Sequence, residues 1–478
     1  MLLMVEILLV HTPFREFSKT RFNPINNGSF EVEHPIGLCY IAAVLEQHGF
    51  NVRIFDMEVM KASSEDFITV VRKLKPRIVG FSCTTVAIEV GFVLAKKTKE
   101  LDPTIQTIFG GVHPSLFPLE VIADPNVDFV AVGEGEYTML ELAEYLFEHK
   151  NIIEEIKGLV YKSNSTPPRI LQNPERPVEA DLDKFPFPAK HLILGNVQRK
   201  YYSSAAYENP ISAIITTRGC PFRCSFCAKF FKTARFRSPD KVLEEIQLIV
   251  DKEKIRDLEI RDYTFNLRQK HNIDICKGII KNQWDIHWRA LVRPELLNQE
   301  LLQYYKKSNC YMLSIGAESG SPRILKFLRK GYGVDHIERA FQLADKYEIE
   351  TSAYFIIGIP GETSDDIAQT VQLIQKTKPT YLVLQIYQPI PGNDLYDLLV
   401  KHKLTPAEHP PYSLFKGFDK PFLNLPNLPN KVLSRMRIYA ILKYLINMDY
   451  LAKLGKVVMK APLRFPRNVR TMIRFLAA

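Results

Sequence analysis

Two series of short apolar segments, each segment followed by a stretch with helical spacing, run through the chain. Such alternation predicts parallel sheets packed against helices. The first series fills residues 1 to about 165, and its helical stretches are Ile36–His48, Val86–Glu100 and Tyr137–Phe147. Its strand candidates are Val5–Val10, Asn51–Phe55, Arg77–Ser82, Gln106–Phe109 and Phe129–Val132. We therefore predict a doubly wound α/β domain, whose ligands bind at the carboxyl ends of the strands.

The second α/β series begins after a proline-rich segment. Six prolines fall within residues 166–188, and neither a helix nor a central strand tolerates that density, so we interpret residues 166–205 as a linker. The six strand candidates that follow are Ile211–Thr217, Asp257–Arg261, Ile286–Leu291, Tyr311–Ile315, Ser352–Ile357 and Tyr381–Ile386. Helical stretches separate them, so the second series also predicts a parallel sheet.

Three of the seven cysteines, Cys220, Cys224 and Cys227, lie in the loop that follows the first strand of the second series. Closely spaced thiolates are soft ligands, which favour iron–sulfur clusters, zinc or copper(I). A structural zinc site needs four protein ligands, and the nearest downstream Cys or His is His271. The spacing therefore predicts a metal centre with one open position, and the alternative is a turn that merely contains three structural cysteines. The odd number of cysteines argues against a disulfide framework and indicates a reducing compartment.

The spacing C-x-x-x-C-x-x-C, with Phe226 before the third cysteine, resembles the signature of the radical S-adenosylmethionine (SAM) enzymes. Later strand ends resemble the same family in the same order: Arg261-Asp262-Tyr263-Thr264-Phe265, Gly316-Ala317-Glu318-Ser319-Gly320 and Gly358-Ile359-Pro360-Gly361. One departure is Tyr263, which stands where relatives carry a second acid.

This resemblance implies a partial (β/α)6 TIM-type barrel over residues 206–410, with its site at the carboxyl ends of the strands. It also implies that Cys220, Cys224 and Cys227 hold a 4Fe-4S cluster whose open iron binds SAM. The residues implied to contact SAM are Phe226, Asp262, Glu318 and Gly358.

The strand ends of the first series resemble the cobalamin-binding domain that precedes the barrel in one class of this family. The matching segments are His11-Thr12-Pro13, Pro35-x-Gly37-x-x-Tyr40-x-Ala42, Gly110-Gly111-x-His113-Pro114-Ser115 and Gly133-Glu134-Gly135-Glu136. The resemblance implies a Rossmann-like cobalamin-binding domain over residues 1–165. The implied cobalamin contacts are Thr12, Ser82, Gly110, Gly111, His113, Gly133 and Glu134.

One motif of cobalamin proteins, D-x-H-x-x-G, is absent. Cobalt is therefore not expected to take a histidine in that way. His113 is expected to shape the loop or the edge of the pocket, and cobalt ligation by His113 is the alternative. A domain that kept the fold and lost the cofactor also stays open.

The resemblance implies that a reductant such as flavodoxin or ferredoxin feeds the cluster, which cleaves SAM to a 5′-deoxyadenosyl radical. No catalytic residue is predicted beyond the cluster site. We expect cobalamin-dependent C-methylation of an unactivated carbon in a lipid-like, tetrapyrrole or natural-product substrate. The alternatives are an oxidative cyclase or rearrangement enzyme of the same superfamily, and a sensor or maturation protein that carries the cluster without turnover.

The net charge of +10 is concentrated at the C-terminal end. Residues 431–478 hold eleven Lys and Arg and one acidic residue, so we predict a basic helical extension over residues 411–478. Lys431–Leu451 has helical spacing with an apolar stripe of Leu433, Met436, Ala440 and Tyr444. Such a helix could contact an anionic membrane surface or pack on the barrel. Nucleic acid binding is disfavoured because aromatic residues do not alternate with the cations.

The segment Met1–Val10 is apolar, but Glu6 interrupts it and no basic region precedes it, so a buried strand is expected there instead of a signal peptide. No apolar run reaches the roughly 18 residues of a membrane span. We therefore expect a cytoplasmic protein, with peripheral contact at the inner face of the membrane as an option.

Overall fold

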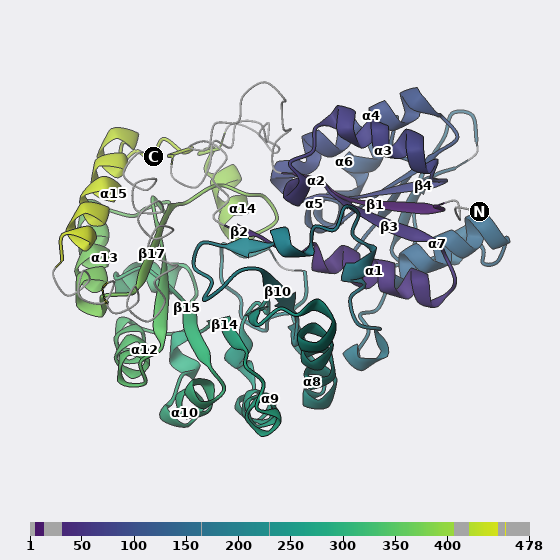
Figure 1. Ribbon diagram of the computed structural model, residues 1–478. Coiled ribbons are helices and arrows are strands. Elements are labelled where there is room, and N and C mark those ends of the chain that lie inside the picture. Colours follow the sequence, from purple (N-terminus) through teal and green to yellow (C-terminus); the bar gives the residue numbers. More distant parts are fainter. Residues whose placement is uncertain are drawn as a thin grey trace. The chain divides into compact units, whose positions relative to one another are not determined.

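The computed structural model describes residues 5–13, 31–163, 165–228, 230–405, 420–447 and 455. The chain divides into two compact units, Met1–Tyr201 and Tyr202–Ala478 (Figure 1). Each unit contains one large sheet, and each is described by itself below.

The sheet of the first unit has seven strands in the order β3-β1-β4-β5-β6-β7-β8. The five predicted strands form its parallel part, with bounds β1 Ile7–His11, β3 Val52–Asp56, β4 Ile78–Ser82, β5 Gln106–Gly110 and β6 Phe129–Ala131. Sequence analysis missed the antiparallel strands β7 (Leu159–Lys162) and β8 (Ile170–Gln172), so the sheet is mixed instead of purely parallel. All three residues of β8 are exposed, and an edge strand without a buried face carries little hydrophobic pattern.

Helices cover both faces of the first sheet (Figure 1). Helices α1 (Ile36–Gln47) and α7 (Glu136–Glu148) pack together on one face, and α3 (Ser64–Leu74) and α4 (Ile88–Leu101) on the other. The shorter elements are β2 Glu31–Val32, α2 Met57–Met60, α5 Val112–Leu116 and α6 Pro118–Ala123. The apolar N-terminal segment supplies β1, which lies between β3 and β4 with Ile7 to Val10 all buried. The expected buried strand is therefore present there.

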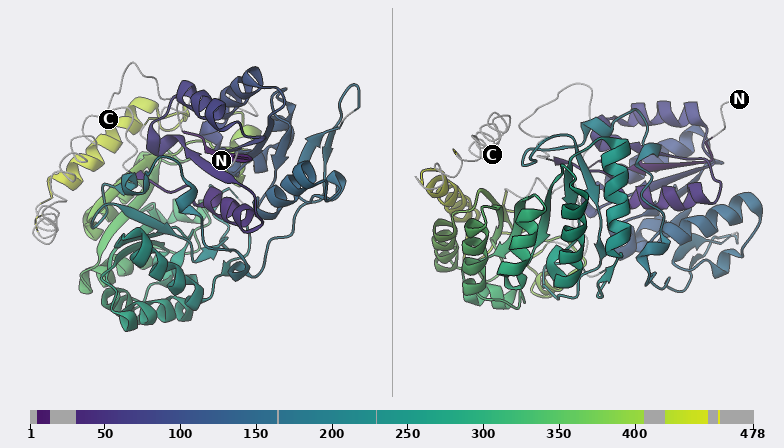
Figure 2. Two further views of the ribbon diagram at one scale, coloured as in Figure 1. Left: turned by 45° about the vertical axis from the view of Figure 1, so that its right-hand side comes forward. Right: turned by 60° about the horizontal axis from the view of Figure 1, so that its bottom comes forward.

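The sheet of the second unit contains six parallel strands in sequential order, β10-β13-β14-β15-β16-β17. Their bounds are β10 Ile211–Ile214, β13 Asp257–Ile260, β14 His287–Val292, β15 Cys310–Glu318, β16 Glu350–Ile357 and β17 Tyr381–Ile386. Each overlaps one predicted strand. Helices lie side by side along the outside of this sheet (Figure 2), namely α8 Pro239–Leu248, α9 Gln269–Asn282, α10 Gln299–Lys307, α12 Val334–Lys346 and α13 Ser364–Thr377. This is the barrel-like arrangement expected from the sequence.

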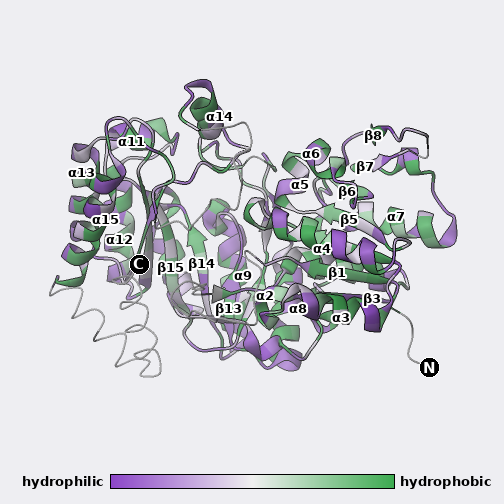
Figure 3. Ribbon diagram, turned by 90° about the horizontal axis from the view of Figure 1, so that it is seen from above, coloured by the Kyte–Doolittle hydropathy of each residue, from purple (hydrophilic) through white to green (hydrophobic). Residues whose placement is uncertain are grey.

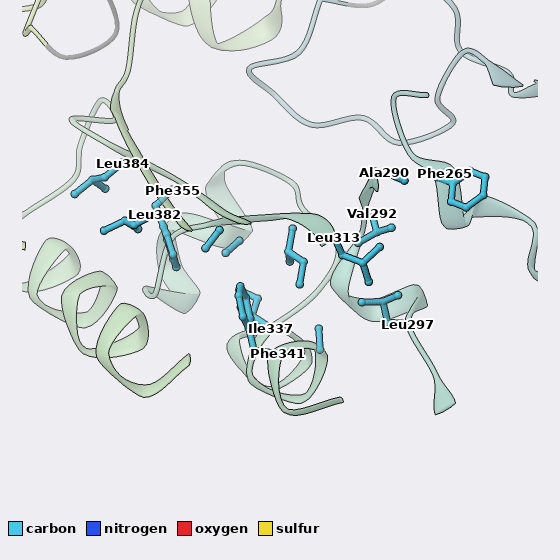
Figure 4. Packing of buried hydrophobic residues seen from close by; sticks show 14 of the residues in the cluster. Phe265, Ala290, Val292, Leu297, Leu313, Ile337, Phe341, Phe355, Leu382 and Leu384 are labelled. Carbon is cyan, nitrogen blue, oxygen red and sulfur yellow. The ribbon is translucent and has the colours of Figure 1, made fainter. Parts of the chain in front are cut away.

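The core of the second unit lies between the sheet and these helices. Phe355 of β16 and Leu382 and Leu384 of β17 are buried in the same cluster as Ile337 and Phe341 of α12 (Figure 4). The covering helices carry both hydrophobic and hydrophilic residues (Figure 3), as amphipathic helices on a sheet do. Burial of each large apolar side chain contributes about 1.5–3 kcal/mol, which makes this layer the main source of stability of the unit.

The C-terminal helix α15 (Asn430–Leu445) packs against α13. Leu433, Ala440 and Tyr444 of the predicted stripe are buried, and Met436 is half-buried. The Tyr444 hydroxyl donates to the backbone oxygens of Pro379 and Thr380, both at 3.0 Å. Of the two arrangements considered for this helix, packing on the barrel is therefore confirmed for its apolar stripe. The expected extension otherwise falls largely outside the described residues, and among those described no helix combines the length and apolarity needed to cross a bilayer.

Gly320, in the loop between β15 and α11 (Pro322–Phe327), touches the backbone of α13 closely. A methyl group there would lie 2.4 Å from the Gln369 oxygen and 2.7 Å from the Thr370 Cα. We expect Gly320→Ala to reduce the free energy of unfolding by about 1–3 kcal/mol, as overpacking does. Chemical denaturation of the apoprotein measures this loss. Gly37→Ala, with no atom within 4 Å of the added carbon, is the matched control, and an equal loss in both variants would contradict the packing argument.

Candidate functional site

The cysteine loop begins at the carboxyl end of β10, where the sequence predicted it. The loop starts at β11 (Thr217–Arg218), which pairs antiparallel with β12 (Arg235–Phe236) after it. Gly219 has φ +88°, and a Cβ there would lie 2.1 Å from the Thr233 oxygen. Only glycine fits this close approach between the two arms of the loop.

The three thiols differ in exposure. Cys224 is buried, Cys220 is half-buried and Cys227 is exposed. The Cys220 amide donates to the Phe231 oxygen at 3.2 Å, and its Sγ lies 3.8 Å from Thr264 Oγ1. Among the described residues, no group of three or more His, Cys, Asp or Glu is already arranged to hold a metal ion. The structure therefore places the three cysteines in one loop. Their side chains would have to move closer together to bind one metal centre.

The surroundings of Cys224 favour its thiolate form. A hydrogen bond from Cys227, followed by the charges of Lys330 and Arg293, lowers the pKa of Cys224 to about 6 against the opposing effect of burial. Thiolates are the metal-binding form of cysteine, so a lowered pKa favours metal binding near neutral pH. The sequence identified Cys224 but offered no signal for its electrostatic surroundings.

Two buried cations beside the loop were not found by sequence reasoning. Arg293 directly follows β14, and its Nη1 lies 3.8 Å from Cys224 Sγ. The Lys330 Nζ forms an ion pair with Glu318 Oε1 at 3.0 Å and lies 5.4 Å from the ring centre of Phe226. Arg293 could have been noticed because it follows a strand end, whereas nothing in the local sequence marks Lys330.

Asp262, predicted to contact SAM, is buried just beyond the end of β13. Its Oδ1 accepts hydrogen bonds from the amides of Thr216 and Thr217 at 2.8 and 2.9 Å, and the Thr216 hydroxyl donates to Oδ2. Burial raises the pKa of Asp262 to about 6 despite these donors. The carboxyl group therefore holds the backbone that leads into the cysteine loop, and its contact with SAM stays a prediction.

The other predicted SAM contacts also lie at strand ends. Glu318 ends β15, has φ +62° and is buried in its ion pair with Lys330. Gly358 follows β16 with φ +77°, and its amide donates to Glu362 Oε2 at 2.6 Å. A Cβ at Gly358 would lie 2.7 Å from Leu433 of α15. Phe226 is half-buried against the core of the barrel unit.

The donor chemistry of this strand-end region suits an iron–sulfur cluster. Three free thiols on one loop supply soft ligands, and the two buried cations beside them can offset negative charge. A cluster held by three thiolates is anionic, and its burial is costly unless charges of the opposite sign lie nearby. The residues present therefore fit such a group.

The predicted cobalamin contacts of the first unit follow β1, β4, β5 and β6, four strands that are neighbours in the sheet. The Thr12 hydroxyl donates to the Ser82 oxygen at 2.6 Å, which ties the ends of β1 and β4 together. Gly110 ends β5, and Gly111 has φ +96°, with a Cβ position only 3.0 Å from the Cys83 oxygen. The parallel sheet thus gathers these residues along one edge, as the sequence predicted.

His113 and the Gly133 loop lie along the same edge. His113, on α5, is fully buried, with its ring centre 5.1 Å from that of Phe117. Gly133 has φ +83° and its amide donates to Ser115 Oγ at 3.0 Å, while Glu134 is half-buried. The full burial of His113 in this packing agrees with the expectation that it shapes the loop. Cobalt ligation by His113 stays the alternative prediction.

A buried polar cluster at the end of β3 was missed by sequence reasoning. Asp56, fully buried, accepts hydrogen bonds from the Tyr201 hydroxyl at 2.8 Å and from His11 Nδ1 at 2.9 Å. The ring of His34 stacks on Tyr201 at 3.7 Å between centres. Tyr201 lies within residues 166–205, the predicted linker, and is the last residue of the first unit, so this cluster attaches that segment to the first sheet.

Two protein-family models match the chain. The model described as the B12 binding domain matches residues 27–143, and the model described as the radical SAM superfamily matches residues 214–374. The first match contains β3 to β6, and the second contains β13 to β16. The matches therefore fall on the two sheets whose strand ends carry the candidate residues.

Among curated proteins, an uncharacterized methyltransferase of Pyrococcus horikoshii is 32% identical over 77% of this chain and 79% of its own length. An anaerobic magnesium-protoporphyrin IX monomethyl ester cyclase of Rubrivivax gelatinosus is 27% identical over 76% of this chain and 66% of its own. The hopanoid C-3 methylase of Methylococcus capsulatus is 26% identical over 75% of this chain and 67% of its own length.

Among solved structures, the radical SAM methyltransferase TsrM from Kitasatospora setae, with cobalamin and a [4Fe-4S] cluster bound, is similar with a TM-score of 0.66 at 18% identity. The alignment covers 84% of this chain and 75% of that one. OxsB, a cobalamin-dependent SAM radical enzyme, gives a TM-score of 0.64 at 20% identity over 84% of this chain and 56% of its own. These likenesses establish the fold.

Gly219 provides a test of the geometry of the cysteine loop. We expect Gly219→Ala to lower the iron and sulfide bound per chain after anaerobic reconstitution at least severalfold, because the methyl group would push the two arms of the loop apart. The control is Gly361→Ala, which also places alanine at positive φ, +79°, but in open space. Equal iron content in both variants would mean that the close approach at Thr233 is unimportant.

Proposed function

Because the chain belongs to the radical SAM enzymes that contain a B12 binding domain, we propose that it transfers a methyl group to a carbon atom of a small organic substrate. The relative from Pyrococcus horikoshii, 32% identical over 79% of its length, carries the family assignment. The two matched family models confirm the predicted combination of domains. The cofactors of this family are a 4Fe-4S cluster, SAM and cobalamin, as the sequence predicted.

In this proposal Cys220, Cys224 and Cys227 hold the cluster. The cluster and SAM together supply a one-electron cleavage that yields methionine and an oxidising radical, and cobalamin supplies the methyl group. The chain itself orients these groups and excludes water. The lowered pKa of Cys224 favours the thiolate form that binds metal. The carboxyl group of Asp262 accepts a hydrogen bond from the Thr216 amide and so fixes the start of the cysteine loop. The proposed SAM contacts are Phe226, Asp262, Glu318 and Gly358.

For cobalamin we propose the edge of the first sheet, with contacts from Thr12, Ser82, Gly110, Gly111, His113, Gly133 and Glu134. Their common position after four adjacent parallel strands supports this proposal, since ligands of doubly wound sheets bind at that edge. The positive φ of Gly111 and Gly133 lets backbone amides come close to a ligand without side chains intervening.

The inner face of the barrel sheet favours a substrate with polar groups. Leu258 and Ile260 of β13 join the core under the helices, so Glu259 and Arg261 between and after them lie on the opposite face. Arg261 Nη1 is 3.1 Å from Glu259 Oε1, and Arg289 Nη2 is 3.0 Å from Glu259 Oε2. Glu259 and Arg289 are already buried, but Arg261 is exposed, and covering its guanidinium with hydrocarbon would cost its hydration. A tetrapyrrole or another polar natural product therefore fits better than a pure hydrocarbon lipid.

An oxidative cyclase is the second candidate function, because the cyclase of Rubrivivax gelatinosus is among the similar proteins. The third alternative, a cluster carrier without turnover, is disfavoured because the similar curated proteins are named as enzymes. A reductant such as flavodoxin or ferredoxin is part of the proposal in the first two cases. A reducing compartment such as the cytoplasm suits the seven free cysteines.

We further propose that the outer face of α15 contacts an anionic membrane surface. Opposite its buried stripe, the helix exposes Ile438 by 54% and Leu442 by 43%, and Ile446 directly after the helix is exposed by 71%. Lys431 and Arg435 are also exposed, and α15 contains no acidic residue. Apolar side chains flanked by cations match the interface of an anionic bilayer.

Product analysis distinguishes the candidate functions. After anaerobic reduction with SAM, cobalamin and candidate substrates, a methyltransferase that recharges cobalamin from SAM should form S-adenosylhomocysteine, 5′-deoxyadenosine and a product heavier by one methylene unit. A cyclase should form 5′-deoxyadenosine without matching S-adenosylhomocysteine, and a carrier should form neither. Quantitative mass spectrometry of the mixture measures all three compounds.

Cys224→Ala should abolish both the cluster absorbance and 5′-deoxyadenosine formation, because the cluster loses a ligand. Cys276→Ala, which removes a buried thiol from α9, is the matched control and should retain both. Undiminished 5′-deoxyadenosine from Cys224→Ala would overturn the assigned cluster site.

Vesicle flotation tests the proposed membrane contact. The native chain should float with vesicles containing phosphatidylglycerol and stay behind with pure phosphatidylcholine. The double variant Ile438→Glu/Leu442→Glu should lose at least half of this binding, whereas Ile280→Glu on the exposed side of α9 should not. Unchanged flotation of the double variant would show that α15 does not provide the contact.

A further inference from the structure

The side chain of Arg293 is held beside the cysteine loop by several contacts that do not involve the cysteines. Its Nε donates to Glu295 Oε1 at 2.6 Å and its Nη2 donates to the Lys330 oxygen. Its guanidinium carbon lies 3.4 Å from the ring centre of Phe222. Only 6% of the residue is exposed. Each nitrogen that does not face the cysteine therefore has a partner of its own.

The backbone of Arg293 is fixed as well. Buried Asn266 forms a pair of hydrogen bonds with it, since the Arg293 amide donates to Oδ1 and Nδ2 donates to the Arg293 oxygen, both at 2.9 Å. The residue directly follows β14, and the pairing of that strand with β13 and β15 fixes the position of its backbone. With backbone and guanidinium both immobilised, the remaining nitrogen, Nη1, is directed at Cys224 Sγ at 3.8 Å.

An N–H group directed at a cysteine sulfur changes the redox chemistry of a cluster bound there. Reduction adds one negative charge, and a donor or a positive charge beside the sulfur stabilises the reduced form more than the oxidised form. The carboxylate of Glu295 contacts Nε and not Nη1, so it partly offsets the charge without occupying the donor that faces the sulfur.

We propose that Arg293 is a positioning residue that raises the reduction potential of the cluster through its hydrogen bond to Cys224. This inference rests on the cluster assignment within the proposed function, but it holds whether the product is methylated or cyclised. It concerns the ease with which a reductant delivers the electron, and it does not require Arg293 to touch SAM or the substrate.

Potentiometric titration of the reconstituted cluster, followed by electron paramagnetic resonance in the absence of SAM, tests the proposal. Arg293→Met should shift the midpoint to a more negative potential by at least about 59 mV, a tenfold change in a one-electron equilibrium. The midpoint potential of Arg293→Lys should lie between those of the native chain and Arg293→Met. Lysine keeps the positive charge but lacks the planar guanidinium group. Arg256→Met, which removes an exposed arginine just before β13, should leave the potential unchanged.

A second variant tests the sign of the effect without touching Arg293. Glu295→Gln removes a negative charge from the far side of the guanidinium, so it should shift the potential to a more positive value. If Arg293→Met assembles too little cluster to titrate, the Glu295→Gln and Arg293→Lys shifts decide the question alone.

Three results would overturn the proposal. The first is an unchanged potential in Arg293→Met together with weaker SAM binding, which would make Arg293 a SAM ligand. The second is a shift of equal size in Arg256→Met, and the third is a negative or absent shift in Glu295→Gln. A native chain that assembles no cluster would remove the cluster assignment itself and this inference with it, whereas a cluster with normal redox behaviour but no methylated product would remove only the methyl-transfer proposal.

Discussion

Parallel pairing of neighbouring strands is the constraint on which both candidate sites depend. In a parallel sheet all carboxyl ends lie at one edge, so loops that are far apart in the chain are brought side by side. In the first unit this edge carries the loops after β1, β4, β5 and β6, and in the second it carries the cysteine loop, Asp262, Arg293, Glu318 and Gly358. The hydrophobic layers beneath the helices fix these strands and leave the edge free for polar residues.

Charge burial at the edge of the barrel sheet has a common pattern. Asp262 is buried with three donors, Glu318 is buried with Lys330, and Arg293 is buried with Glu295. Each charged group has at least one partner of opposite charge or one hydrogen-bond donor within the chain, because an uncompensated charge at this depth would be too costly. Such satisfied groups are rigid, and a rigid surrounding keeps a reactive centre in one geometry. The proposed role of Arg293 follows from this rigidity as much as from its charge.

The strands of the two parallel sheets and the position of the cysteine loop were accessible from the sequence because both depend on short-range patterns, whereas the order of the strands within the first sheet came from the structure. Every barrel strand was found from its apolar run, and the loop from the spacing of its cysteines. Strand β8 was missed because an exposed edge strand has no buried face to mark it. Arg293 and Lys330 were missed for another reason: they lie 69 and 106 positions after Cys224, and no local pattern links residues so far apart.

The sequence by itself determined the two α/β series, the soft-ligand loop and the family to which the chain belongs, since periodicity and motif spacing are written in neighbouring residues. The tertiary structure decided which charges surround Cys224, that Tyr201 is fastened to Asp56, and that α15 packs on the barrel unit while exposing a second apolar face. These features depend on packing between distant segments, and the free energy of such contacts exists only after the strands and helices have been assembled.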